Sequence, residues 1–204
     1  STIYDTPGTK DCDESKFIGM VASSLHVESH VSEPEAEQVP EEHKRVVWAM
    51  ENPPENTCMS GWNTFRLVSQ TNVIVTLDGQ GADEQLGGYP NYISIYLAGL
   101  PFWRSLGEAF DYLITGKFYL EVIRGISLNV LRMLIGQPRL EGLLSKKLDR
   151  DISLNLNIQM ATDLDTSLVT MIHFADRTSM AHSIESRMPF MDYRLVEFLA
   201  SVPA

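Results

Sequence analysis

The feature that most constrains this chain is an uninterrupted apolar run leading directly into a loop of glycines and acids. The run is Val73-Ile74-Val75-Thr76-Leu77, and four of its five residues are β-branched. Such a run is typical of a strand buried on both faces of a parallel sheet. The loop is Asp78-Gly79-Gln80-Gly81-Ala82-Asp83-Glu84. Because open parallel sheets bind ligands outside the carboxyl ends of their strands, this loop is the predicted ligand site.

Strand and helix patterns alternate before Gly88, and only helical patterns follow it. Further strands are expected at Ile3–Tyr4 and Val27–Val31. Helices are expected from Asp13 to about Leu25, from the acidic 33–42 segment to near Met50, and at Ser60–Ser69. This order predicts an α/β fold: part of a doubly wound parallel sheet in residues 1–90, followed by a mainly helical part in residues 91–204.

Composition excludes several classes of protein. Against 27 aspartates and glutamates the chain has 16 lysines and arginines, and this net charge of −11 argues against a general nucleic-acid surface. Cys12 and Cys58 cannot build a disulfide framework, which favours a reducing, cytoplasmic location. Polar and charged residues interrupt the most apolar stretch, residues 118–135, so no membrane span and no membrane partner are expected.

The loop suits phosphates and a metal ion. Gly79 and Gly81 allow backbone conformations and a close ligand approach that a Cβ would block. Asp83 and Glu84 could bind Mg²⁺, which takes carboxylate and phosphate oxygens together. A plain connecting loop, with both acids placed to favour a helix start, is the alternative. The motifs of P-loop, dinucleotide-binding and EF-hand sites are absent from this loop.

Two blocks of sequence resemble one known family. Residues 78–89, D-G-Q-G-A-D-E-Q-L-G-G-Y, resemble the S-G-E-G-A-D-E-x-x-G-G-Y loop of the asparagine synthetases. Residues 176–197 are similar to that family's D-R-x-S-M-A-x-S-I-E-x-R-x-P-F-L-D-x-R-L-V-E block. Residues 13–15 and 51–54 fall where the family has its D-E-S and D-E-P elements. The resemblance spans nearly the whole chain.

The resemblance implies a synthetase domain of the ATP pyrophosphatase type, with an adenine nucleotide alpha hydrolase-like sheet. Such domains activate a carboxylate, usually that of aspartate, as an acyl-adenylate, and ammonia from a glutaminase domain then forms the amide. The implied cofactors are ATP and Mg²⁺. Asp83, with Glu84 beside it, is the implied metal site, and Gln80 stands at the catalytic position. The implied nucleotide-binding residues are Asp78, Gly79, Gly81, Ala82, Asp83 and Glu84.

One departure from the family concerns the chemistry. Gln80 replaces a glutamate that is a proposed base for the attacking amine, and Asp78 replaces a serine. Glutamine cannot accept a proton at neutral pH, so Gln80 can only orient a group by hydrogen bonds. An amide-forming enzyme of the β-lactam synthetase or lasso-peptide cyclase kind therefore stays open.

The second departure from the family is that several of its functional elements are absent from this sequence. The chain contains no S-G-G-x-D-S phosphate loop, no counterpart of the family's catalytic lysine and no glutaminase domain. We expect a fragment that is inactive alone, and a non-catalytic interaction module stays open. Without the strand that leads into the phosphate loop, Val73–Leu77 would expose a sheet edge. This predicts a rearranged sheet or a partner chain, with a homo-oligomer as one form.

Other residues are expected to be structural. Arg177 and Glu185 are eight residues apart and would share one face of a continuous helix. The acidic 33–42 segment is expected to be a solvated loop. Residues expected to pack in the core are Met20, Met133, Met160, Met171, Met180, Met188, Met191, Trp48, Trp62 and Trp103.

Overall fold

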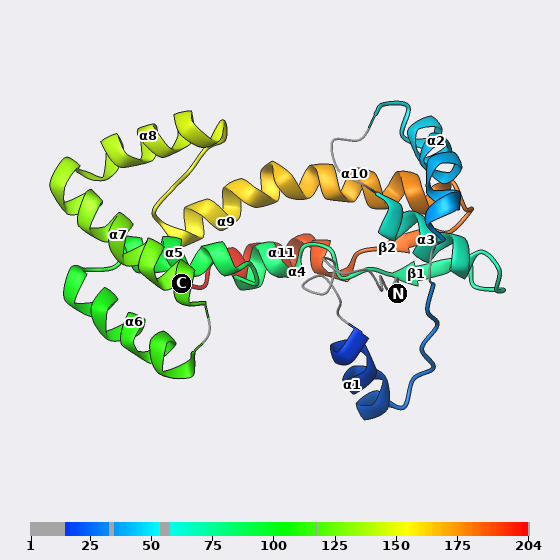
Figure 1. Ribbon diagram of the computed structural model, residues 1–204, viewed down its shortest axis with the longest axis horizontal. Coiled ribbons are helices and arrows are strands. Elements are labelled where there is room, and N and C mark those ends of the chain that lie inside the picture. Colours follow the sequence, from blue (N-terminus) through cyan, green and yellow to red (C-terminus); the bar gives the residue numbers. More distant parts are fainter. Residues whose placement is uncertain (1–14, 33–34, 54–57, 117, 204) are drawn as a thin grey trace. The chain divides into compact units, whose positions relative to one another are not determined.

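The computed structural model describes residues 15–32, 35–53, 58–116 and 118–203 (Figure 1). The chain divides into two compact units. The first comprises Ser1–Asp78 and Met171–Arg187, and the second comprises Gly79–Thr170 and Met188–Ala204. Ile3, Tyr4, Cys12 and Asp13, for which a strand, a thiol and a helix cap are expected, lie outside the described residues.

Helices of the first unit lie where the sequence predicts them. They are α1 (Ser15–Leu25), α2 (Val39–Met50), which follows the short 3₁₀ helix η2 (Ala36–Gln38), and α3 (Met59–Val68). Helix α2 ends because Glu51 adopts a left-handed conformation, with φ of 57°. The C-terminal part of α10 (Ser167–Met180) also belongs to this unit.

The sheet of the first unit has two parallel strands in the described part of the chain. They are β1 (Val75–Leu77) and β2 (Glu185–Arg187), and Thr76 lies opposite Ser186. The described residues thus form a mostly helical fold with a small parallel sheet. The predicted strand at residues 27–31 is wrong: the chain leaves α1 through His26, with φ of 53°, and then runs without regular structure.

The burial predicted for β1 is also wrong. Val73, Ile74 and Leu77 are exposed, and Leu77 reaches an exposed fraction of 76%. The physical reason is that β1 has a single neighbouring strand, β2, among the described residues. A β-branched run specifies a strand, whereas its burial depends on the layers around it.

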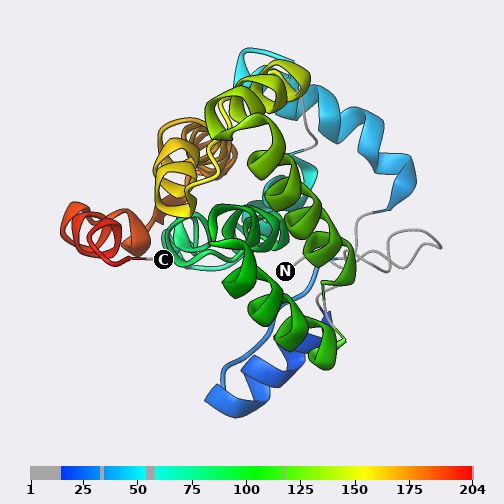
Figure 2. The same ribbon diagram turned by 90° about the vertical axis from the view of Figure 1, so that its left-hand side faces the viewer.

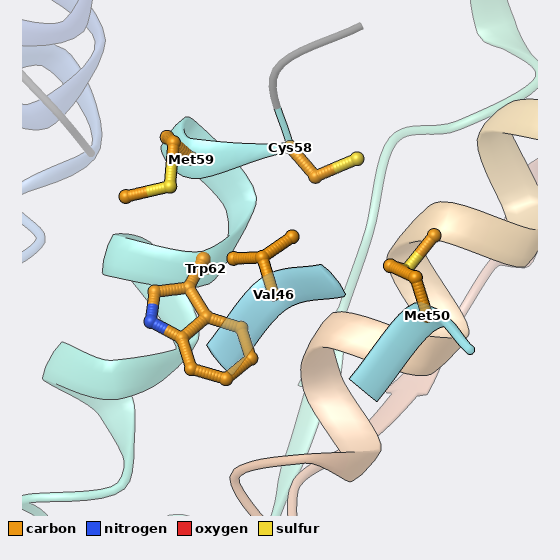
Figure 3. Close-up of a cluster of buried hydrophobic side chains, with 5 residues drawn as sticks. All are labelled: Val46, Met50, Cys58, Met59 and Trp62. Atoms are coloured by element: carbon orange, nitrogen blue, oxygen red, sulfur yellow. The ribbon is translucent and has the colours of Figure 1, made fainter. Parts of the chain in front are cut away.

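A cluster of buried side chains forms the core of the first unit (Figure 3). Its members come from α2, α3 and the residue before α3: Val46, Met50, Cys58, Met59 and Trp62. Burial raises the pKa of the Cys58 thiol. Trp62 is the one tryptophan that packs as expected, since Trp48 and Trp103 are exposed, as are Met20, Met133, Met171 and Met180. The core prediction for those six residues is wrong because their helix faces have no covering layer among the described residues.

Glu42 departs from the expected solvated loop, because α2 begins inside the acidic segment. Its carboxylate is buried and accepts a hydrogen bond of 2.5 Å from Trp62 Nε1. Arg45 and Arg66 lie 3.2 and 3.4 Å from the same carboxylate. This set of partners offsets the cost of burying the charge.

The second unit contains helices throughout its described residues. Its elements are α4 (Ala82–Leu86), α5 (Pro90–Gly99), α6 (Phe102–Thr115), α7 (Tyr119–Ile135), α8 (Gln137–Leu148), α9 (Leu156–Asp165), the N-terminal part of α10, the 3₁₀ helix η3 (Pro189–Met191) and α11 (Tyr193–Ala200). Helices thus predominate after Gly88, although β2 lies in a stretch where the sequence indicated only helices.

Helix α5 is the centre of the packing in the second unit. Gly125 of α7 lets this helix approach α5 closely, because a Cβ there would come within 2.8 Å of the Leu97 side chain. The last carbonyl groups of α5 accept hydrogen bonds from Ser105, Asn129 and Arg132. Since the final carbonyls of a helix have no partner within it, these side chains from α6 and α7 complete α5.

Candidate functional site

The loop after β1 begins at Asp78. The Asp78 N–H donates a hydrogen bond of 2.8 Å to the Arg187 carbonyl, which extends the pairing of β1 with β2 by one residue. The chain passes from the first unit to the second between Asp78 and Gly79. The predicted strand, turn and short helix are therefore present in that order.

Gly79 and Gly81 differ in what the fold requires of them. Gly81 is buried in a left-handed conformation, with φ of 92°, and a Cβ there would lie 2.7 Å from Met191 Sδ. At Gly79 a Cβ would meet no atom within 4 Å, and its backbone is not left-handed. The protein itself needs glycine at position 81, whereas at position 79 it leaves open space beside the backbone.

Gln85 holds the start of α4 in place. Its Nε2 donates to the Gly81 carbonyl at 2.9 Å and to the Phe190 carbonyl at 2.7 Å, so the loop is tied to η3. Sequence analysis missed Gln85. The spacing of four residues between Gly81 and Gln85 could have indicated this contact, because a helical side chain lies over the turn that precedes it in the sequence.

Glu84 is buried, with an exposed fraction of 1%. Its Oε1 accepts a hydrogen bond of 2.6 Å from the Tyr89 hydroxyl. Burial, followed by this contact with Glu84, raises the pKa of Tyr89 well above its ordinary value. The Tyr89 ring also contacts that of Tyr92, whose hydroxyl donates to Asp163 at 2.8 Å. Glu84 and Tyr89 thus form one hydrogen-bonded pair, and a ring contact joins it to a second pair, Tyr92 and Asp163.

Asp83 is exposed and lies over Gly88. A Cβ at position 88 would come within 2.0 Å of Asp83 Oδ1, so the absent side chain of Gly88 makes room for the carboxylate. Neighbouring helix positions point about 100° apart, and therefore Asp83 and Glu84 do not face one point. Among the residues that the structure describes, no three of His, Cys, Asp and Glu form a group able to hold a metal. The Asp83 carboxylate is open to solvent, whereas that of Glu84 is engaged by Tyr89.

Residues 176–197 cover the end of α10, β2, η3 and the start of α11. The expectation that Arg177 and Glu185 share a helix face is wrong, because α10 ends at Met180. Arg177 instead lies 3.4 Å from Glu51, and Glu185 pairs with Arg187 at 2.8 Å. The Asp192 carboxylate caps α11, and its hydrogen bonds from Arg194 lower the pKa of Asp192 to about 2.

A cavity of about 390 Å³ lies in the second unit. Tyr92, Tyr96 and Tyr112 line it together with apolar side chains and two amides. None of the lining residues, all within the described part of the chain, is charged. This lining does not suit phosphates or a free carboxylate, so we do not assign the cavity to a site for ATP or aspartate.

Comparison with known families decides where the chain belongs. The family model described as asparagine synthase matches residues 3–204. The chain belongs to the asparagine synthase family. It is 27% identical over 200 residues to asparagine synthetase [glutamine-hydrolyzing] 2 of Bacillus subtilis, covering 94% of this chain and 26% of that relative. It is 30% identical over 132 residues to asparagine synthetase [glutamine-hydrolyzing] 3 of the same organism, covering 64% of this chain and 20% of that relative.

The asparagine synthase match fits the resemblance carried by residues 78–89 and 176–197. The chain spans about a quarter of the length of the curated relatives it matches. No solved structure matches it. No helix in the described part of the chain is long and apolar enough to cross a membrane.

Proposed function

We propose that this chain is part of an ATP-dependent synthetase that activates the carboxylate of aspartate as an acyl-adenylate and converts it into an amide. The observation that carries the proposal is the Gly79–Glu84 loop, which follows the carboxyl end of a parallel strand in a chain of the asparagine synthase family. Open α/β sheets bind nucleotides at that end of their strands. The proposed acyl acceptor is ammonia supplied by a glutaminase domain, because both relatives are named as glutamine-hydrolyzing synthetases.

The residues of the loop take different parts in this proposal. Open space beside Gly79 admits the phosphates of ATP, and Asp78, Gly81 and Ala82 shape the backbone that faces them. Asp83 is the proposed ligand of Mg²⁺, which would shield the charge of the pyrophosphate leaving group. Glu84, buried against Tyr89, positions α4 and hence Asp83. Gln80 orients the attacking amine through hydrogen bonds.

The proposal also includes a larger sheet than the two described strands. In a doubly wound sheet β1 would have neighbours on both sides and helices on both faces. Val73, Ile74 and Leu77 are apolar and exposed, as expected of a strand that such neighbours would cover. Helices of the same polypeptide or of a second copy would cover these side chains, and a further strand would pair with the edge of β1 that β2 does not occupy.

The test is aspartate-dependent exchange of pyrophosphate into ATP, measured on the full-length polypeptide that carries these residues. Asp83→Asn keeps the shape of the side chain and removes its charge. We expect it to lower exchange about 100-fold or more, because a bound metal contributes several kcal/mol of charge stabilisation. Asp111→Asn, an exposed position on α6, serves as the matched control. Full exchange activity in Asp83→Asn would refute the assignment.

The glutamine at position 80 favours a second candidate function, in which the same adenylation is followed by attack of a different amine. A glutamine at the position of the family's glutamate leaves open an amine other than ammonia, as in enzymes of the β-lactam synthetase or lasso-peptide cyclase kind. Gln80→Glu should change the relative use of ammonia and larger amines in product formation while leaving pyrophosphate exchange nearly unchanged. Equal loss of both reactions would place Gln80 in the adenylation step instead.

A further inference from the structure

The cavity of about 390 Å³ in the second unit is enclosed by several elements that are distant in the sequence. Its walls come from α4, α5, α6, α9 and α11, together with the glycine that ends α4 and the residues that follow α11. Figure 2 turns α6 toward the viewer, with α5 behind it. Sites for small molecules are concave, mostly apolar and about 300–1,000 Å³ in volume. The cavity therefore has the size of such a site.

Three tyrosine rings form walls that the fold holds in place. Tyr96 of α5 and Tyr112 of α6 pack against the buried cluster that joins α5, α6 and α7. Tyr92 is 2% exposed, and its hydroxyl donates a hydrogen bond of 2.8 Å to Asp163 of α9. Because these side chains are already fixed by other contacts, a ligand would not have to order them.

Some hydrogen-bonding groups in these walls have no partner among the described residues. The hydroxyl groups of Tyr96 and Tyr112 make no hydrogen bond to another described side chain or carbonyl. Burial raises the pKa of Tyr112, and the nearby Tyr96 raises it further, so the Tyr112 hydroxyl stays protonated and able to donate. Gln85 also lines the cavity, and its Oε1 is buried without a hydrogen-bond partner. A buried polar atom of this kind normally bonds to a water or to a ligand.

The chemistry of the lining selects the class of ligand. No lining residue is charged, so an ionised ligand would lose its hydration without gaining an opposite charge. Tyrosine rings pack well against other aromatic rings, in offset or edge-to-face arrangements. The unpartnered hydroxyl and amide oxygens can accept hydrogen bonds from the ligand.

We propose that this cavity binds a neutral aromatic compound that carries an N–H or O–H group. The site is separate from the Gly79–Glu84 loop, and the proposal does not depend on the proposed synthetase function. Leu86 and Gly87 in the wall belong to the end of α4, the helix that also carries Asp83. A bound compound would therefore contact the helix on which the candidate metal ligand lies.

The test uses the full-length polypeptide and two fluorescent probes with the same rings. N-phenyl-1-naphthylamine is neutral and has one N–H group, whereas 1-anilinonaphthalene-8-sulfonate adds a negative charge to the same skeleton. We expect the neutral probe to bind saturably, with one site per chain, and about 10-fold more tightly than the sulfonate or better. ATP should not displace it, because the uncharged lining does not suit phosphates.

Variants with matched controls place the bound probe in the cavity. Met160→Trp adds bulk to the wall and should weaken binding about 10-fold or more. Met133→Trp is the same substitution at a position of α7 that is 63% exposed and outside the lining, and it should leave binding unchanged. Tyr112→Phe removes one hydroxyl and should weaken binding about 3-fold to 10-fold. Tyr119→Phe, at an exposed position of α7, is its control.

Several results would overturn the proposal. They are the absence of saturable binding, which would also follow if another part of the polypeptide filled the cavity, displacement of the probe by ATP, and equal affinity for the two probes. Native affinity in Met160→Trp or in Tyr112→Phe would overturn it as well. Circular dichroism checks that each variant folds, and Tyr112→Phe decides the matter if Met160→Trp does not.

Discussion

Single residues of the Gly79–Glu84 loop separate into those that the fold requires and those that it does not. Gly81 is held by its left-handed backbone and by its contact with Met191, and Glu84 by its burial against Tyr89. Gly79 and Asp83 face open space or solvent. We propose that the ligand contacts residues of the second kind.

The two glycines provide a matched pair of variants. Gly81→Ala should lower the free energy of unfolding by about 1–3 kcal/mol, because alanine is strained at positive φ. Gly79→Ala should leave stability within about 0.5 kcal/mol and lower pyrophosphate exchange about 10-fold to 100-fold, because a Cβ there would displace the phosphates. Urea unfolding and the exchange assay measure the two effects. Native exchange activity in a stable Gly79→Ala protein would contradict a phosphate site at this position.

Removal of the Tyr89 hydroxyl tests how much the hydrogen bond between Tyr89 and Glu84 contributes to stability. We expect Tyr89→Phe to lower the free energy of unfolding by about 1–3 kcal/mol, because it leaves a buried carboxylate without its hydrogen-bond donor. Glu84→Gln should cost less, since the amide oxygen can still accept from Tyr89. Urea unfolding compares the two variants. Equal stability of Tyr89→Phe and the native protein would show that the hydrogen bond contributes nothing.

At the scale of elements, sequence periodicity predicted most helices of the structure and failed where burial depends on distant partners. The boundaries expected for α1, α2 and α3 hold to within about two residues, because helix signals are local. The exposure of β1 and of Trp48 and Trp103 could not be predicted, since it depends on which layers cover them. In the site, the order of strand, glycine turn and acidic helix start was predictable. The contacts of Gln85 with Phe190 and of Glu42 with Trp62 join distant residues and were not.

The crossing of α5 and α7 depends on one glycine. Gly125→Ala should lower the free energy of unfolding by about 1–3 kcal/mol, because its Cβ would lie 2.8 Å from the Leu97 side chain and 3.1 Å from the Ser94 backbone. Gly107→Ala on α6 is the control, since a Cβ there meets no atom within 4 Å. That variant should raise stability by about 0.5–1 kcal/mol through its helix propensity. Thermal unfolding of both variants tests this packing, and equal effects would contradict it.

At the scale of the whole molecule, the 204 residues carry Asp83, which the family resemblance implies as a metal ligand, but not the other parts of the family's ATP site. The S-G-G-x-D-S loop and the catalytic lysine of the family do not occur in this sequence. We therefore expect these residues alone to show no aspartate-dependent exchange, because the phosphates would lack most of their contacts. AMP formation by the 204-residue chain alone would contradict the claim that the missing phosphate loop and lysine are needed for activity.

The central claim, activation of a carboxylate as an acyl-adenylate, is tested most directly by following the carboxylate oxygen. The full-length polypeptide is supplied with ATP, ammonia and aspartate labelled with oxygen-18 in its side-chain carboxylate, and the products are analysed by mass spectrometry. In adenylation a carboxylate oxygen attacks the α-phosphorus and expels pyrophosphate. Attack of ammonia on the acyl carbon then breaks the carbon–oxygen bond, so that oxygen stays on AMP. We predict one labelled oxygen in AMP and none in pyrophosphate. Labelled phosphate formed together with ADP, or AMP without label, would contradict the proposal.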